Sequence, residues 1–149
     1  MNIERHVELA SNIGRSLAHL GPDDHEMAIE AAMLAGTHWL NAALHADRIA
    51  DEDEDVVHCS MLVVNTVRKY AVAEPALVGA LQEIEDLRPL HVRGDVPGGS
   101  AAGHRALDLL AAMRLRAIDA ITAIDAIDAI DAIEAEGSTH SADSLQEAR

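Results

Sequence analysis

The chain has 149 residues, the usual size of one compact domain, and its formal net charge is -15, from 26 acidic residues against 11 lysines and arginines. This charge excludes the basic face of a nucleic-acid binder and disfavours an anionic membrane, so we expect no DNA partner and no membrane partner. One cysteine excludes an intramolecular disulfide. The first residues lack the basic start and apolar stretch of a signal peptide, so the expected location is cytoplasmic.

The hydrophobic pattern predicts an all-α fold, a four- to five-helix bundle with a long C-terminal helix. With no Phe, one Trp and one Tyr, the core must be filled by aliphatic side chains and alanines, a composition that favours helices. An apolar stripe with steps of three and four predicts a first helix over residues 3–20. A second helix is expected over 23–48, with Asp23 and Glu26 forming its N-terminal capping box.

The second helix carries one narrow polar strip on an otherwise apolar surface. At 100° per residue, the strip falls within about 100°. Its members are Glu30, Thr37, His38, Asn41 and His45. Apolar residues, Met27 and Leu34 among them, cover the remaining surface. We therefore place this helix at the centre of the bundle.

Three further helices are expected after an acidic turn. The run 51–55 is a solvated turn, and helical spacing predicts a third helix over 56–72. A fourth helix begins at Pro75. After an irregular stretch, Ser100 is expected to cap the fifth. Residues 1–136 then form one domain, and the polar residues 137–149 are expected to be a disordered tail.

An Ala-Ile-Asp repeat over residues 117–136 extends the last helix. Its isoleucines recur every three residues, so each lags its predecessor by about 60° around an α-helix. Six isoleucines circle the helix completely, unlike the seam of a coiled coil. A straight helix can therefore bury only two or three of them on one face. The rest either belong to a low-complexity extension without function or form a surface for self-association.

Nine histidines raise the question of a metal site. His38 and His45 lie two turns apart on the polar strip, but a zinc or iron site needs three or four ligands, usually from more than one helix. The signatures Glu-x-x-His and His-Glu-x-x-His are absent from the sequence. We therefore expect no cofactor and interpret the strip as polar residues that either face solvent or form hydrogen bonds between helices. A metal site that uses His38 and His45 is the alternative.

A second candidate site is a cationic, glycine-rich connection over residues 88–105. Free N–H groups at a helix N-terminus beside arginines could hold a small anion or a nucleotide, although neither phosphate-binding fingerprint is present. The interpretation that competes with it is an ordinary flexible loop. The candidate anion-binding residues are Arg88, His91, Arg93, Gly98, Gly99, Ser100 and Arg105.

No set of residues supports nucleophilic catalysis. His58 and Cys59 are adjacent, and neighbours on a helix point about 100° apart, so they do not form a dyad. A buried, inert thiol is the expected state of Cys59. We therefore predict no catalytic residues.

The small and apolar pattern from Ala31 to His45, followed by an acidic turn and by Asp55-Val56-Val57-His58, resembles the HEPN-like helical bundles. The resemblance covers residues 27–113. Ribonuclease members of that family carry an Arg followed by four to six residues and then a His, and no Arg in this chain has that spacing. The resemblance therefore implies a non-catalytic member, such as a binding or antitoxin-like partner.

The sequence thus predicts a helical interaction or oligomerisation module whose partner is a second copy of the chain or another protein. Anion binding by the cationic connection and metal binding by the histidines of the second helix are the alternatives.

Overall fold

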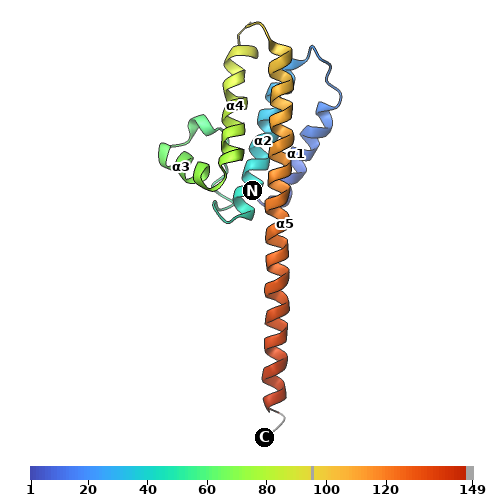
Figure 1. Ribbon diagram of the computed structural model, residues 1–149, viewed down its shortest axis with the longest axis vertical. Helices are drawn as coiled ribbons and strands as arrows, with labels where there is room; N and C mark the ends of the chain where they lie inside the picture. The colour runs from blue at the N-terminus through green and yellow to red at the C-terminus, as the bar shows by residue number, and fades with distance from the viewer. Residues whose placement is uncertain (95, 147–149) are drawn as a thin grey trace.

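The computed structural model describes the backbone of residues 1–94 and 96–146, and their side chains up to residue 130 except 125 and 128. Within these residues the fold is all-α, as predicted, and ends in a long helix (Figure 1). The α-helices are α1 (Ile3–Leu17), α2 (His25–Ala46), α3 (Val64–Ala73), α4 (Pro75–His91) and α5 (Gly99–Gln146). None of the described helices combines the length and apolarity needed to cross a membrane.

The central position predicted for α2 is confirmed, because it contacts α1, α4 and α5. Gly36 allows its close approach to α5, since a Cβ at that position would lie 3.0 Å from the Sδ atom of Met113. The expectation that α2 shows only its polar strip to solvent is wrong, because most of the strip is buried and two apolar residues of the helix are exposed. Met27 and Leu34 are 59% and 50% exposed. They are seven residues apart and therefore share one face, which α2 presents to solvent in its first half.

Two predicted helix caps are wrong. The N-cap residue of α2 is Asp24 rather than Asp23, and it makes no side-chain bond to the helix. Its carboxylate instead accepts a hydrogen bond from the N–H of Gly21 at 2.7 Å. Ser100 lies inside the first turn of α5, where the carbonyl of Gly98 accepts from the N–H of Ala102. Gly98 has a φ of +100°, a conformation that favours glycine.

The third predicted helix begins eight residues later than expected. Residues 56–63 form an extended segment with one 3₁₀ turn, η1 (Cys59–Met61), and α3 follows. The carboxylate of Glu85 on α4 accepts hydrogen bonds from the N–H groups of Cys59 and Ser60, at 2.8 and 3.1 Å. These bonds satisfy backbone donors that a helix would have satisfied internally. A tertiary contact therefore overrides the helical spacing of the sequence.

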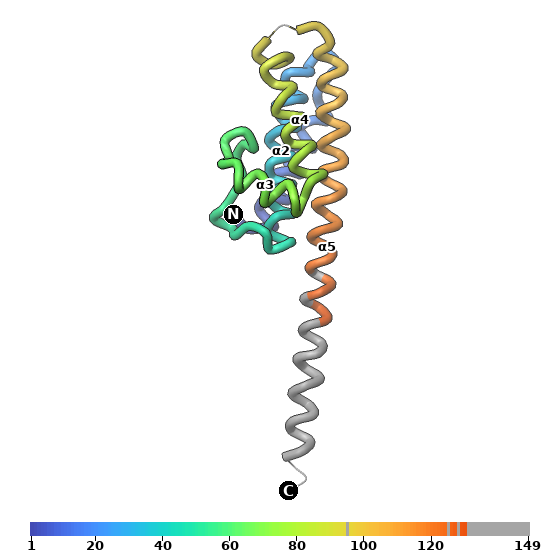
Figure 2. The backbone as a smooth tube through the Cα atoms, turned by 60° about the vertical axis from the view of Figure 1, so that its left-hand side comes forward, coloured from blue at the N-terminus to red at the C-terminus, as the bar shows by residue number. Residues whose placement is uncertain are grey.

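α5 packs on the bundle with its first half and continues past the other helices (Figures 1 and 2). Ile121 and Ile124 lie against the core, whereas Ile118, Ile127 and Ile130 are 37%, 51% and 56% exposed. The prediction that only two or three isoleucines are buried is confirmed for the described part of the repeat. The expected disorder of 137–149 concerns residues that lie outside those whose side chains the structure describes.

Candidate metal centre

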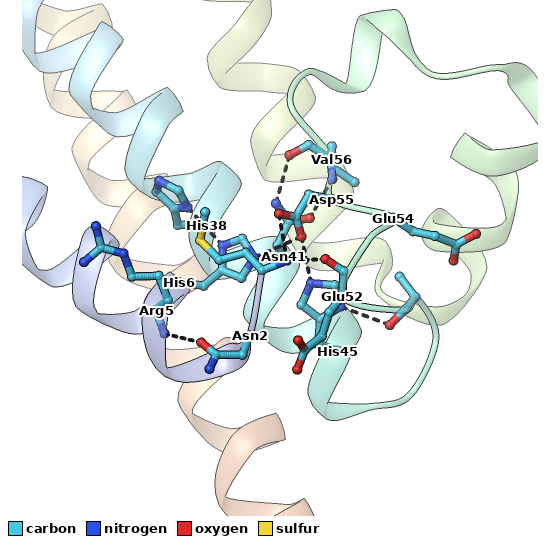
Figure 3. A network of polar contacts seen from close by, with 12 residues as sticks. Asn2, Arg5, His6, His38, Asn41, His45, Glu52, Glu54, Asp55 and Val56 are labelled. Carbon is cyan, nitrogen blue, oxygen red and sulfur yellow. Dashed lines mark hydrogen bonds and ion pairs between the residues drawn. The ribbon is translucent and has the colours of Figure 1, made fainter.

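Three histidine rings from two helices lie in a row beside the acidic turn (Figure 3). His6 comes from α1, and His38 and His45 lie two turns apart on the polar strip of α2. The ring centroid of His6 is 5.3 Å from that of His38 and 5.3 Å from that of His45. Since His6 is only 1% exposed and His45 8% exposed, the row is set into the interface between α1 and α2.

Asp55 completes the cluster from the end of the acidic turn. Its Oδ1 atom lies 2.9 Å from Nε2 of His45 and 3.1 Å from Nε2 of His6. These three atoms all lie within 4.8 Å of one another. Metal–ligand bonds of about 2.0–2.2 Å place ligand atoms roughly 3–4 Å apart. The three groups could therefore hold one small cation after a minor adjustment.

Asn41 fixes the position of Asp55 through the residue that follows it. The side-chain amide of Asn41 donates to the carbonyl of Val56 at 2.8 Å, and its Oδ1 atom accepts from the N–H of Val56 at 2.8 Å. Both residues are buried, at 2% and 1% exposure, so water does not compete for these bonds. The side chain of Asn41 thus holds the end of the acidic turn against α2, the helix that also carries His38 and His45.

The tautomer of His45 is set by its second ring nitrogen. Nδ1 of His45 lies 3.0 Å from the carbonyl of Ala50, which can only accept, so Nδ1 carries the proton. A neutral His45 therefore has a lone pair on Nε2, directed at the carboxylate of Asp55. Two acceptors at 2.9 Å repel each other unless a proton or a metal ion lies between them. In metal sites, a histidine usually donates the N–H of one ring nitrogen to a carbonyl and uses the other nitrogen as the ligand.

His6 and His38 are suited to the neutral state. Burial lowers the pKa of His6, despite its hydrogen bond to Asp55, and burial followed by repulsion from His6 lowers the pKa of His38. Their Nδ1 atoms lie 3.0 Å apart, so one ring donates to the other. If His6 is the donor, its Nε2 atom also offers a lone pair to the position beside Asp55.

The carboxylate of Asp55 stays ionised in this setting. Burial alone would raise its pKa, but hydrogen bonds from His45 and His6, with the nearby positive charge, outweigh burial and lower it. The α-amino group of Met1 contributes, 3.3 Å from Oδ2. A cation that displaced the two Nε2 protons would meet one negative charge and two nitrogen lone pairs.

The sequence prediction located part of this cluster. His45 lies in it. His38 lies on the far side of the His6 ring and bonds to that ring rather than to Asp55, so it supports His6 rather than the shared centre. His6 and Asp55 were missed. His6 occupies a position of the apolar stripe of α1, three residues after Ile3 and four before Ala10. A histidine within an apolar stripe is the signal that could have found it.

The structure does not gather the predicted anion-binding residues around open cations. Arg88 pairs with Glu30 at 2.9 Å, and Arg105 makes two bonds to Glu83, at 2.6 and 2.9 Å. Nδ1 of His91 lies 3.2 Å from the carbonyl of Val96.

The glycines of the same connection have structural roles of their own. Gly99 lies so close to His25 that a Cβ would approach Nε2 to 2.1 Å. Arg93, Gly98 and Ser100 are exposed or lie near the start of α5. Anion binding remains an untested prediction, with two of its three arginines already neutralised by carboxylates.

No family model, no curated protein and no solved structure matches this chain. The HEPN-like resemblance therefore stays a prediction.

Proposed function

We propose that this protein binds one divalent transition-metal ion through Nε2 of His6, Nε2 of His45 and Oδ1 of Asp55. The observation that carries the proposal is the convergence of these three atoms, within 4.8 Å of one another, from α1, α2 and the acidic turn. Two imidazoles and one carboxylate are ligands that suit Zn²⁺ and Fe²⁺. The alternative stated from the sequence, a metal-binding bundle that uses histidines of the second helix, thus becomes the leading function, with His6 and Asp55 in place of His38.

The proposed ion would keep at least one coordination position for water or a small ligand. Metal sites with three protein ligands and an open position are typical of catalysis, whereas structural zinc sites take four protein ligands. The supporting bonds are also those expected around a metal: His45 donates to Ala50, and Asn41 holds the chain beside Asp55. These features support a site able to activate or capture a ligand rather than one that only stabilises the fold.

An imidazolium–carboxylate pair is the competing state of the same residues. In that state a proton on Nε2 of His45 takes the place of the metal, and the cluster only ties the acidic turn to α2. Because metal binding must displace this proton, the two states are mutually exclusive and zinc binding weakens as the pH falls.

The test is calorimetric titration of the metal-stripped protein with ZnCl₂, together with metal analysis after dialysis. We expect one zinc per chain in the wild type. His45→Ala and Asp55→Asn should each weaken binding at least about tenfold, because each removes a ligand or its charge. His104→Ala is the matched control. His104 lies on the exposed start of α5, where its Nδ1 atom lies 2.8 Å from the carbonyl of Ser100 in the preceding turn. Stoichiometric binding that survives in both cluster variants, or no binding at all, would contradict the proposal.

A second function is favoured by the exposed isoleucines of α5. Ile127 and Ile130 are 51% and 56% exposed on a helix that has left the bundle (Figure 2). Exposed aliphatic rows of this kind are typical of association surfaces. We therefore also propose that the chain self-associates through the repeat. Light scattering should show that replacing both residues with Gln lowers the mass, whereas replacing the exposed Ala126 and Ala129 with Gln does not. An unchanged mass in the isoleucine variant would remove the repeat from the interface.

A further inference from the structure

A groove of about 910 Å³ runs along the border of α1 and α5. Trp39 of α2 contributes to its lining and is itself 3% exposed. Gly14 of α1 leaves one wall open, because a Cβ at that position would meet nothing within 4 Å. Leu110 and Leu115 of α5 form the other wall, and Leu115 is 63% exposed. The groove is therefore an apolar surface without a cover from the described part of this chain.

Two arginines line the same groove. Arg15 of α1 and Arg114 of α5 are both exposed. Arg15 donates to the neutral side-chain amide of Asn12, which leaves its charge uncompensated. Among the described residues, neither arginine makes an ion pair, whereas Arg5, Arg88, Arg105 and Arg116 all pair with carboxylates. An apolar groove with two uncompensated positive charges is unusual on a chain whose net charge is -15.

The chain contains one segment with the complementary chemistry. The Ala-Ile-Asp repeat presents aliphatic side chains and carboxylates in alternation, with isoleucines on every side of the helix. Ile127 and Ile130 are exposed, and Asp128 lies between them in the sequence. Isoleucines could fill the apolar floor while aspartates pair with Arg15 and Arg114.

The repeat of one chain cannot reach the groove of the same chain. Leu110 and Leu115 line the groove on α5, and the same unbroken helix then carries the repeat away from it (Figure 1). From Leu115 to Ile130 an α-helix advances about 22 Å. A second copy related by a two-fold axis perpendicular to α5 would place its α5 antiparallel to the first. Each repeat would then lie along the groove of the other copy, which makes the contact reciprocal.

We infer that the groove between α1 and α5 receives the Ala-Ile-Asp repeat of a second copy of this chain, with Arg15 and Arg114 pairing with its aspartates. This inference rests on the self-association proposed above and adds the surface that accepts the repeat. It is independent of the metal centre.

The first test fills the groove without disturbing the bundle. Gly14→Leu places a side chain in the groove where the added Cβ meets nothing, and it also improves helix propensity. Gly79→Leu on α4 is the matched control, because Gly79 is also helical, exposed and free of atoms within 4 Å of an added Cβ, but does not line the groove. Sedimentation equilibrium on the full chain should show at least about a tenfold weaker dimer for Gly14→Leu and no change for Gly79→Leu.

The second test reverses the charge of the groove. Arg114→Glu should weaken the dimer at least about tenfold. Added salt should weaken the wild-type dimer but not the variant's, because Glu repels the aspartates and salt screens that repulsion. Arg68→Glu, an equal change at an exposed position of α3, should leave the dimer as it is.

The outcomes separate the two proposals about association. In one outcome, the isoleucine variant dissociates the dimer, whereas Gly14→Leu and Arg114→Glu leave it intact. This result would overturn the groove as the binding surface and keep self-association through the repeat. A wild-type chain that stays monomeric overturns both.

Dodecanoate is the probe for a small amphipathic acid in the groove. Tight binding of dodecanoate by a monomeric wild-type chain, lost in Gly14→Leu, would replace the second copy as the occupant.

Discussion

The side chain of Asn41 forms two hydrogen bonds with the backbone of Val56: it donates to the carbonyl and accepts from the N–H, each at 2.8 Å. The pair joins the middle of α2 to the residue that follows Asp55. It therefore connects the packing of the bundle to the geometry of the candidate metal centre, although neither residue is a proposed ligand.

Replacing Asn41 should affect both stability and metal binding. Asn41→Ala leaves a buried N–H and a buried carbonyl of Val56 without partners, so we expect the free energy of unfolding to fall by about 2–4 kcal/mol in urea titrations. Zinc affinity should fall as well, because Asp55 loses its support. Thr37→Val is the control: it removes one buried hydroxyl that bonds to Met33 within α2, so it should cost less and leave zinc affinity unchanged. Equal effects of the two variants would show that Asn41 only fills space.

His38 should act on the metal through His6. If the Nδ1 contact between the two rings fixes the tautomer of His6, then His38→Phe should weaken zinc binding by about 10- to 100-fold. Losing a residue that orients a metal ligand has an effect of this size. One zinc per chain should still bind at saturation, which distinguishes a positioning residue from a ligand. The measurement is competition with a chromophoric chelator. His38→Gln, which can still bond to Nδ1, should recover part of the affinity. A loss of stoichiometry in His38→Phe would instead make His38 a ligand.

The free energy of unfolding should depend on pH through the carboxyl group of Glu74. This residue, 2% exposed between α3 and α4, bonds to Arg116 of α5. Burial and a hydrogen bond with Asp47 raise its pKa above the ordinary value of 4.5, although Arg116 opposes them. The folded state then binds more protons than the unfolded state, so this contribution to stability is complete below pH 4.5 and is lost as the pH rises through the raised pKa.

The corresponding experiment compares unfolding free energies of the wild type and Glu74→Gln at several pH values. As the pH rises above 4.5, the free energy of unfolding of the wild type should fall relative to that of the variant. Glu4→Gln, an exposed change on α1, should run parallel to the wild type. Parallel curves for Glu74→Gln would show that its carboxyl titrates alike in the folded and unfolded chains.

Cys59 should be inert in the folded protein. Its side chain is 3% exposed, and burial, with the nearby charge of Glu85, raises the pKa of its thiol to about 12. Because the thiolate is the reactive form, Ellman's reagent should react negligibly with native protein from about pH 7 to 9 and fully in urea. Fast reaction of the native protein would show that η1 opens locally. This outcome would also weaken the expectation of a buried thiol, which the structure otherwise confirms.

The sequence by itself determined the elements that depend on local spacing. The stripe of α1, the central position of α2, the start of α4 at Pro75 and the burial of only two or three isoleucines all follow from side-chain periodicity along one helix. Each of these features depends on the angle between successive residues, which is a property of the chain alone.

The tertiary structure decided which polar residues meet. His6 and Asp55 are 49 residues apart, and they approach only because α1 packs against α2 while Asn41 holds the acidic turn beside both. The same kind of contact keeps the first eight residues of the helix predicted over 56–72 out of the helix, since Glu85 binds the backbone of Cys59 and Ser60 from α4. Hydrogen bonds between distant segments leave no periodic signal in the sequence, because their geometry is set by the packing of whole helices rather than by the spacing within one.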